Sequence, residues 1–198
     1  MAKFTSIAAP VTTLLKEKAS KFFAYAYPVQ NLAEINQRLD ELKTEHPKAR
    51  HHCYAYRIGV GERMIARTND AGEPANSAGM PILNQVRSAG LTNILIVVVR
   101  YFGGTKLGLP GLIAAYKTAA ADVIKNAILA EDFEKEQLML KTTYHKLSEL
   151  QNFLKKRNVE ITAQEFNEMC ILHAAVDAET ASEIKSELLQ LPYIQILP

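Results

Sequence analysis

Apolar and polar residues alternate with a period of two near the start of the chain, which is typical of β-strands. Phe23, Tyr25 and Tyr27 alternate with smaller residues, and the polar run KEKAS separates them from a short apolar segment. We therefore predict a hairpin with strands at residues 11–15 and 21–29.

Helical spacing follows this hairpin. Asn31 and Glu34 have the capping-box spacing that opens a helix, and the helix should end before a proline at position 47. A second hairpin is expected next, turning at residues 59–61 and running to about residue 68. Its first strand places one set of side chains on a single face: His52, Tyr54, Tyr56 and Ile58.

The central stretch contains all nine glycines of the chain. Residues 70–81, which read DAGEPANSAGMP, hold too many turn formers for a regular element, so we predict a loop and then a helix closing at Gly90. Residues 94–99 are apolar throughout, as expected for a central strand buried on both faces. After the glycine cluster at 103–111, helical spacing predicts a long buried helix to about Ala127.

The remainder of the chain has a more regular pattern. Strand-like and helix-like segments follow one another in the order βαββαβ, which indicates a ferredoxin-like sandwich of two helices on a four-stranded sheet. The polar run AEDFEKEQ lies before this pattern. We therefore predict an α+β protein with two domains, residues 1–133 and residues 134–198.

Composition restricts the class of protein. With 48% hydrophobic and 22% charged residues, the chain has ordinary globular composition and enough apolar mass to bury a core. Neither a secretory signal nor an apolar run of ~18 residues is present, so we expect a cytoplasmic protein without a membrane partner. Cys53 and Cys170 lack ligand spacing and are expected to be reduced core residues.

Charge is distributed unevenly along the chain. Residues 1–130 contain 16 Lys and Arg against 9 Asp and Glu, a net charge of +7, whereas residues 131–198 contain 7 against 12, a net charge of −5. A basic domain of this kind favours a polyanionic partner such as RNA. The same asymmetry would also arise if the two domains attracted each other, and charge alone leaves both interpretations open.

The segment after the buried strand, residues 100–111, reads RYFGGTKLGLPG. Glycines allow positive φ and close backbone approach, a following helix presents free amides, and Arg100 and Lys106 add positive charge, so the segment suits a phosphate. The spacing fits neither a P-loop nor a dinucleotide fingerprint, so we expect no ATP, GTP or NAD and no other cofactor. A tight turn that packs the helix on the sheet is the alternative.

Asp70 and Glu73 are two carboxylates three residues apart in the predicted loop. Such a pair could serve as acid and base or hold a hard metal ion, with His51 or His52 as a further group. The two histidines are adjacent and should point to opposite faces of a strand. Loop carboxylates also commonly cap helices or pair with arginines such as Arg100. We assign no catalytic residue and no metal ligand.

Six segments of the chain form one signature: DAGEP at 70–74, AGMPIL at 78–83, VVVRYFGG at 97–104, KLG at 106–108, GL at 111–112 and AY at 115–116. Together they resemble the YigZ/IMPACT family. The resemblance covers nearly all of residues 10–130, including the strand at 49–57, and the end of the chain is similar by pattern to the small second domain of the bacterial branch. The family loop usually reads DDGEP, and Ala71 here replaces its second Asp, which weakens a metal role for this loop.

This resemblance implies a fold and a cellular context. It implies a first domain similar to the second domain of ribosomal protein S5, and a second domain similar to the ferredoxin-like modules of elongation factor G. Eukaryotic relatives bind a ribosome-associated activator of a translation-control kinase, through an additional N-terminal domain. The resemblance therefore suggests a link to translation by analogy of family.

We expect a non-enzymatic binding protein, linked to translation or its regulation, that contacts RNA or a ribosome-associated partner through the basic glycine-rich loop. The alternative is a hydrolase acting on a small phosphorylated or peptide substrate through Asp70, Glu73 and His52. A third possibility is a scaffold for a protein partner. The candidate binding residues are His52, Asp70, Glu73, Arg100, Tyr101, Phe102, Gly103, Gly104, Lys106, Gly108 and Gly111.

Overall fold

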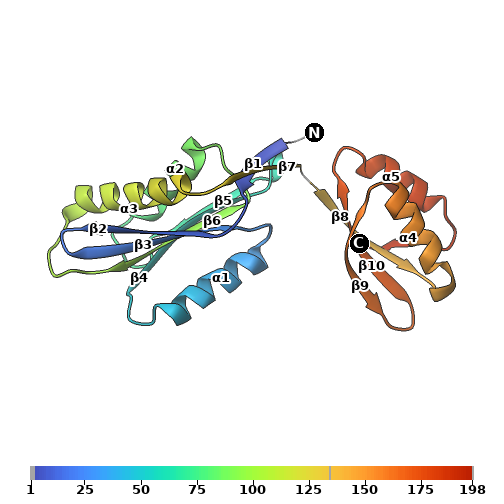
Figure 1. Ribbon diagram of the computed structural model, residues 1–198, viewed down its shortest axis with the longest axis horizontal. Coiled ribbons are helices and arrows are strands. Elements are labelled where there is room, and N and C mark those ends of the chain that lie inside the picture. Colours follow the sequence, from blue (N-terminus) through green and yellow to red (C-terminus); the bar gives the residue numbers. More distant parts are fainter. Residues whose placement is uncertain (1–2, 134, 198) are drawn as a thin grey trace. The chain divides into compact units, whose positions relative to one another are not determined.

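The structure is a computed structural model that describes residues 3–133 and 135–197. The described residues divide into two compact units, one comprising Phe4–Asp132 and the other comprising Phe133 and residues 135–197 together with Lys3 (Figure 1). Among the described residues, no helix is both long enough and apolar enough to cross a membrane.

The larger unit is built on one antiparallel sheet of five strands in the order β2-β3-β6-β4-β5. The apolar strand predicted to be central is β6, and its residues 94–100 are all buried between β3 and β4. Both predicted hairpins are confirmed as β2–β3 and β4–β5. The strand bounds are Val11–Glu17 for β2, Ser20–Pro28 for β3, His51–Ile58 for β4, Ile65–Asn69 for β5 and Ile94–Tyr101 for β6.

Three helices cover the two faces of this sheet (Figure 1). Helix α1, Leu32–Glu45, lies on one face, and its start is the predicted capping box, in which the Asn31 side chain accepts from the Glu34 amide at 3.0 Å. Helices α2, Gly79–Ser88, and α3, Gly108–Lys125, lie on the other face. Their apolar stripes form two separate cores, one on each side of the sheet.

The alternation along β6 decides which side chain enters which core. Val98 belongs to the core beneath α2 and α3, whereas Val97 and Val99 belong to the core beneath α1. Because successive side chains of a strand point to opposite faces, Arg100 lies on the α2–α3 side and Tyr101 on the α1 side. This division places the candidate residues on two different surfaces.

A small two-stranded sheet was not predicted from the sequence. It pairs β1, Lys3–Ile7, with β7, Leu129–Phe133. The turn between β4 and β5 contains a short 3₁₀ helix, η1, Gly61–Arg63. The five residues of β7, LAEDF, are mostly exposed and show no alternation of buried and exposed positions. The pairing therefore leaves no periodic signal in the sequence.

The smaller unit has the predicted order βαββαβ and a four-stranded antiparallel sheet in the order β11-β8-β10-β9. The predicted α+β class and ferredoxin-like arrangement are confirmed. Its two helices and its sheet bury a core of their own. The bounds are Lys135–Thr142 for β8, Tyr144–Lys146 for the 3₁₀ turn η2, Leu147–Lys156 for α4, Glu160–Phe166 for β9, Cys170–Asp177 for β10, Ala181–Leu189 for α5 and Gln195–Leu197 for β11.

Candidate functional site

Asp70 organises the loop between β5 and α2. One oxygen of its carboxylate accepts hydrogen bonds from the amides of Ala78 and Gly79 at 2.9 and 2.8 Å, and the other accepts from the Asn76 amide at 2.8 Å. These amides would otherwise lack partners at the start of the helix, where negative charge is also favourable. Both carboxylate oxygens of Asp70 therefore bind backbone amides of its own loop and of the start of α2, as the capping interpretation of the sequence predicts.

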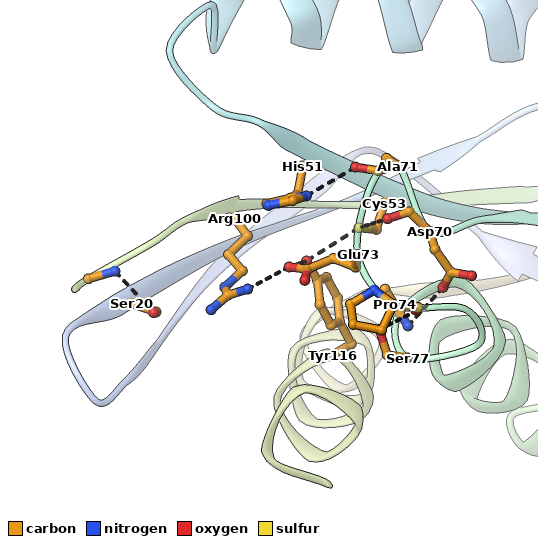
Figure 2. A network of polar contacts seen from close by, with 12 residues as sticks. Ser20, His51, Cys53, Asp70, Ala71, Glu73, Pro74, Ser77, Arg100 and Tyr116 are labelled. Atoms are coloured by element: carbon orange, nitrogen blue, oxygen red, sulfur yellow. Dashed lines mark hydrogen bonds and ion pairs between the residues drawn. The ribbon is translucent and has the colours of Figure 1, made fainter. Parts of the chain in front are cut away.

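Glu73 and Arg100 form a buried ion pair. Glu73 Oε1 lies 2.6 Å from Arg100 Nη1, and the two side chains are only 4% and 7% exposed. The Tyr116 hydroxyl, from α3, donates to the same carboxylate oxygen at 2.9 Å (Figure 2). A buried charge needs such partners to offset the loss of water, and the predicted pairing of Arg100 with a loop carboxylate is confirmed.

Aromatic rings flank the guanidinium of Arg100. Its central carbon lies 5.5 Å from the ring centroid of Phe22 and 5.6 Å from that of Phe102. On the neighbouring strand, His51 is the register partner of Arg100, and its Nδ1 donates to the Ala71 carbonyl at 3.0 Å. The ion pair and the Tyr116 hydroxyl connect β6 and α3 to the loop, and the hydrogen bond of His51 connects β4 to the same loop. These contacts enclose Arg100, which is therefore inaccessible to a large ligand.

The same cluster contains two groups with raised pKa values. Burial raises the pKa of the Cys53 thiol to about 12, and burial together with Cys53 raises the pKa of the Tyr116 hydroxyl. The thiol lies 3.0 Å from the Asp70 carbonyl oxygen and 3.3 Å from the Tyr116 hydroxyl. Both groups stay protonated at neutral pH, so neither acts as a nucleophile there.

The structure separates His52 from the two carboxylates. His52 pairs in register with Val99 and faces the α1 side of the sheet, whereas Asp70 and Glu73 interact on the α2–α3 side. The acid, base and histidine of the hydrolase alternative therefore do not meet. Among the described residues, no group of three or more His, Cys, Asp and Glu side chains is arranged to hold a metal ion.

The glycine-rich loop packs against the turn between β2 and β3. A Cβ on Gly103 would lie 2.1 Å from the Ala19 carbonyl carbon, so no larger residue fits there, and the Gly103 amide donates to the Ser20 hydroxyl at 3.2 Å. Gly104 and Gly108 both have positive φ, at 88° and 72°. These contacts agree with the tight-turn interpretation of the loop.

An exposed group of lysines surrounds this junction. Lys18 lines a small hollow with Leu107 of the glycine-rich loop and with Gly111, and Lys21 lines another with Phe102. Over the part of the chain that the structure describes, none of the lysines in this group has an ion-pair partner, although the acidic residue Glu17 lies among them. We call this group the lysine rim, and its members are Lys16, Lys18, Lys21 and Lys106.

Tyr101 and Phe102 lie at the open end of β6. Tyr101 is partly buried on the α1 side, and Phe102 is 56% exposed. Of the candidate side chains, Phe102 and Lys106 are therefore exposed, Tyr101 and His52 are partly buried, and the ion pair of Arg100 and Glu73 is buried. Tyr116 was not among the candidate site residues, although it lies in the AY segment at 115–116 that contributes to the family resemblance. Lys21 and the residues contributed by β3 and α1 were also missed, because they are distant along the chain and carry no motif.

Comparison with known sequences places the larger unit in a family. Residues 18–124 match the Impact N-terminal domain. This chain belongs to the IMPACT family. It is 30% identical to the IMPACT family member YigZ of Escherichia coli over 182 residues, which cover 91% of this chain and 89% of YigZ.

The similarity extends over both units in one solved structure and over about half of the chain in a eukaryotic relative. A crystal structure described as that of a hypothetical protein has a TM-score of 0.73 and 28% identity, and covers 100% of this chain and 97% of its own. The IMPACT homolog of Schizosaccharomyces pombe is 32% identical over 97 residues, 48% of this chain and 34% of that protein. The match to the eukaryotic relative thus covers about half of this chain, whereas the match to the solved structure covers all of it.

Proposed function

We propose that this protein is a non-enzymatic binding protein that contacts single-stranded RNA through the lysine rim beside the glycine-rich loop. The observation that carries the proposal is that all four lysines of the rim are exposed and, within the described residues, lack ion-pair partners. Unpaired lysines on a part of the chain with a net charge of +7 favour a phosphate backbone.

The proposal gives Arg100 a structural role. Its charge is already neutralised by Glu73, and its side chain is 7% exposed, so it does not bind phosphate. Arg100 instead holds the segment that presents Phe102 and the glycine-rich loop. Lys106 is the cation of this segment that remains free for a ligand.

The family supplies the cellular context for this proposal. We infer a partner in translation, either ribosomal or regulatory RNA, because the sequence resembles a family whose eukaryotic members act on the control of translation. No enzyme is proposed, since the carboxylates of the hydrolase alternative are occupied by structural hydrogen bonds.

Salt dependence tests the proposal directly. A labelled single-stranded RNA titrated with the full chain should bind at low salt, and log K should fall with log salt by about 0.7 for each phosphate contact. The double variant Lys18→Ala, Lys21→Ala removes two contacts and should reduce this slope by about 1.4. The matched control is Lys155→Ala, Lys156→Ala, which removes the same charge from exposed positions of α4.

Two results would overturn RNA binding by the rim. One is the absence of binding at low salt, which would favour a protein partner. The other is an equal loss of slope in the α4 control, which would indicate a general charge effect. The Arg100→Ala variant is unsuitable for this purpose, because it would break the buried ion pair.

A further inference from the structure

An aromatic hollow of about 400 Å³ lies on the α1 side of the sheet, at the ends of β3 and β6. Its volume is within the range of about 300–1,000 Å³ that is usual for small-ligand sites. Ala19 belongs to the turn that packs on the glycine-rich loop, and Phe102 directly precedes Gly103 of that loop. The lining residues are Ala19, Lys21, Phe23, His46, Tyr101 and Phe102.

Three aromatic rings that line the hollow contact one another. Phe23 and Tyr101 meet edge to face, with ring centroids 5.9 Å apart, and the His46 ring lies 5.4 Å from Phe23 and 5.7 Å from Tyr101. Phe102 is more than half exposed, while one side of its ring contacts the guanidinium of Arg100. Its remaining surface is free to contact a planar group.

A chain of hydrogen bonds holds these rings. The Tyr25 hydroxyl donates to Glu45 at 3.3 Å and lies 2.6 Å from His46 Nε2, and His46 Nδ1 lies 2.9 Å from the Tyr101 hydroxyl. With Tyr25 donating to Glu45, His46 donates from Nε2 to Tyr25 and accepts at Nδ1 from Tyr101. Tyr101 therefore has a fixed position before any ligand arrives, which lowers the entropic cost of binding.

We propose that this hollow takes one unstacked base of the bound RNA, with Phe102 as the stacking surface and Lys21 at the phosphate next to that base. The inference rests on the proposed function and adds the site at which a base is held. Aromatic rings beside unpaired lysines are the combination used for single strands, since every base has a flat face and every nucleotide a negative charge. The ion pair of Arg100 and Glu73 would then serve to position Phe102.

Binding to two nucleic-acid strands of equal length distinguishes a failure of this inference from a failure of the proposed function. One is a single-stranded RNA, and the other is an abasic strand that keeps the same sugars and phosphates. The full chain should bind the RNA about tenfold more tightly than the abasic strand, because stacking of one base is lost. Phe102→Ala should weaken RNA binding about tenfold and leave binding of the abasic strand unchanged.

Phe166→Ala, at a position in β9 that is 54% exposed, should change neither affinity. Equal affinity of the full chain for both strands would overturn the base site and leave the lysine rim standing. Failure to bind either strand would overturn the proposed function itself.

A second measurement does not depend on the folding of a variant. RNA that contains 4-thiouridine is irradiated on the unaltered protein, and the crosslinked peptide is mapped by mass spectrometry. An adduct on Tyr101 or Phe102 is expected. Adducts confined to other parts of the chain would overturn the assignment of this hollow.

Discussion

The two sides of the sheet differ sharply at the end of β6. On the α2–α3 side, Arg100, Glu73 and Tyr116 form a closed network in which the charges are neutralised and the side chains are buried. On the α1 side, Tyr101, the next residue along the strand, lines an open hollow together with Lys21, which has no ion-pair partner among the described residues. Two adjacent residues of one motif thus have different surroundings: Arg100 belongs to the buried network, and Tyr101 lines the accessible hollow.

This difference shows how a motif can mislead when its residues are considered as one site. The segment at 100–106 contains two cations, and the sequence suggests that both bind the same anion. Because side chains alternate between the two faces along β6, Arg100 points into the core. Lys106 lies beyond the end of β6, in the glycine-rich loop, and its side chain is exposed. The buried cation shapes the surface, and the exposed cation remains for a partner.

The largest effect is expected on the closed side. Removing either charge, by Arg100→Ala or Glu73→Ala, leaves the other buried without its partner, and should lower the free energy of unfolding by about 3–5 kcal/mol. Denaturant titration followed by circular dichroism measures this change. A loss below about 1 kcal/mol, the usual contribution of an exposed pair, would show that the pair is solvated.

A double variant tests whether the charges themselves are needed. Arg100→Met, Glu73→Leu replaces the pair with apolar side chains of similar size, and should recover most of the stability lost in either single variant. Recovery would show that the pair fixes the loop without adding net stability. A double variant as unstable as the singles would indicate that Tyr116 and Phe22 require the charged groups.

Asp70 should have the next largest effect. Asp70→Ala removes the acceptor of three amides and should lower the free energy of unfolding by about 2 kcal/mol, the upper end for a capping residue. Asp70→Asn keeps one side-chain oxygen for Ala78 and Gly79 and should cost less. If the Ala and Asn variants are equally stable in denaturant titration, the carboxylate does not organise this loop.

Much of this arrangement could be predicted from the sequence. The capping box of α1, the central position of β6 and the pairing of Arg100 with a loop carboxylate follow from local spacing and from the cost of burying a charge. The order of elements in the smaller unit also follows from periodicity alone.

The hollow could not be predicted in the same way. His46 and Tyr101 are 55 positions apart and meet only because α1 returns across the sheet. The lysine rim combines the turn between β2 and β3 with a loop more than 80 residues later, brought together by the tight fit of Gly103 on Ala19. Such contacts depend on tertiary packing and have no periodic signal.

Phe102 should have a small effect on stability and a larger one on binding. Phe102→Ala removes a half-exposed ring from the Arg100 guanidinium, and should lower the free energy of unfolding by about 0.5–1 kcal/mol. Thermal melting of the full chain measures this loss. Phe102→Leu, which keeps apolar cover on Arg100, should melt closer to the unaltered protein. A loss as large as that of Arg100→Ala would show that Phe102 is part of the buried network that stabilises the fold.

The smallest effect is expected from pH, on the α1 side of the sheet. Burial lowers the pKa of His52 from its ordinary value of 6.5, and within the described residues its buried Nε2 has no hydrogen-bond partner. The unfolded chain therefore binds a proton more readily than the folded one, so stability is constant above about pH 7 and falls as pH decreases through 6.5. The fall should be modest, because the ring is only partly buried.

His52→Gln should flatten this decline between pH 7 and pH 5 in denaturant titrations, whereas His145→Gln, at an exposed position, should leave it unchanged. A His52→Gln variant that loses stability on acidification as steeply as the unaltered protein would show that His52 takes up its proton in the folded state as readily as in the unfolded state.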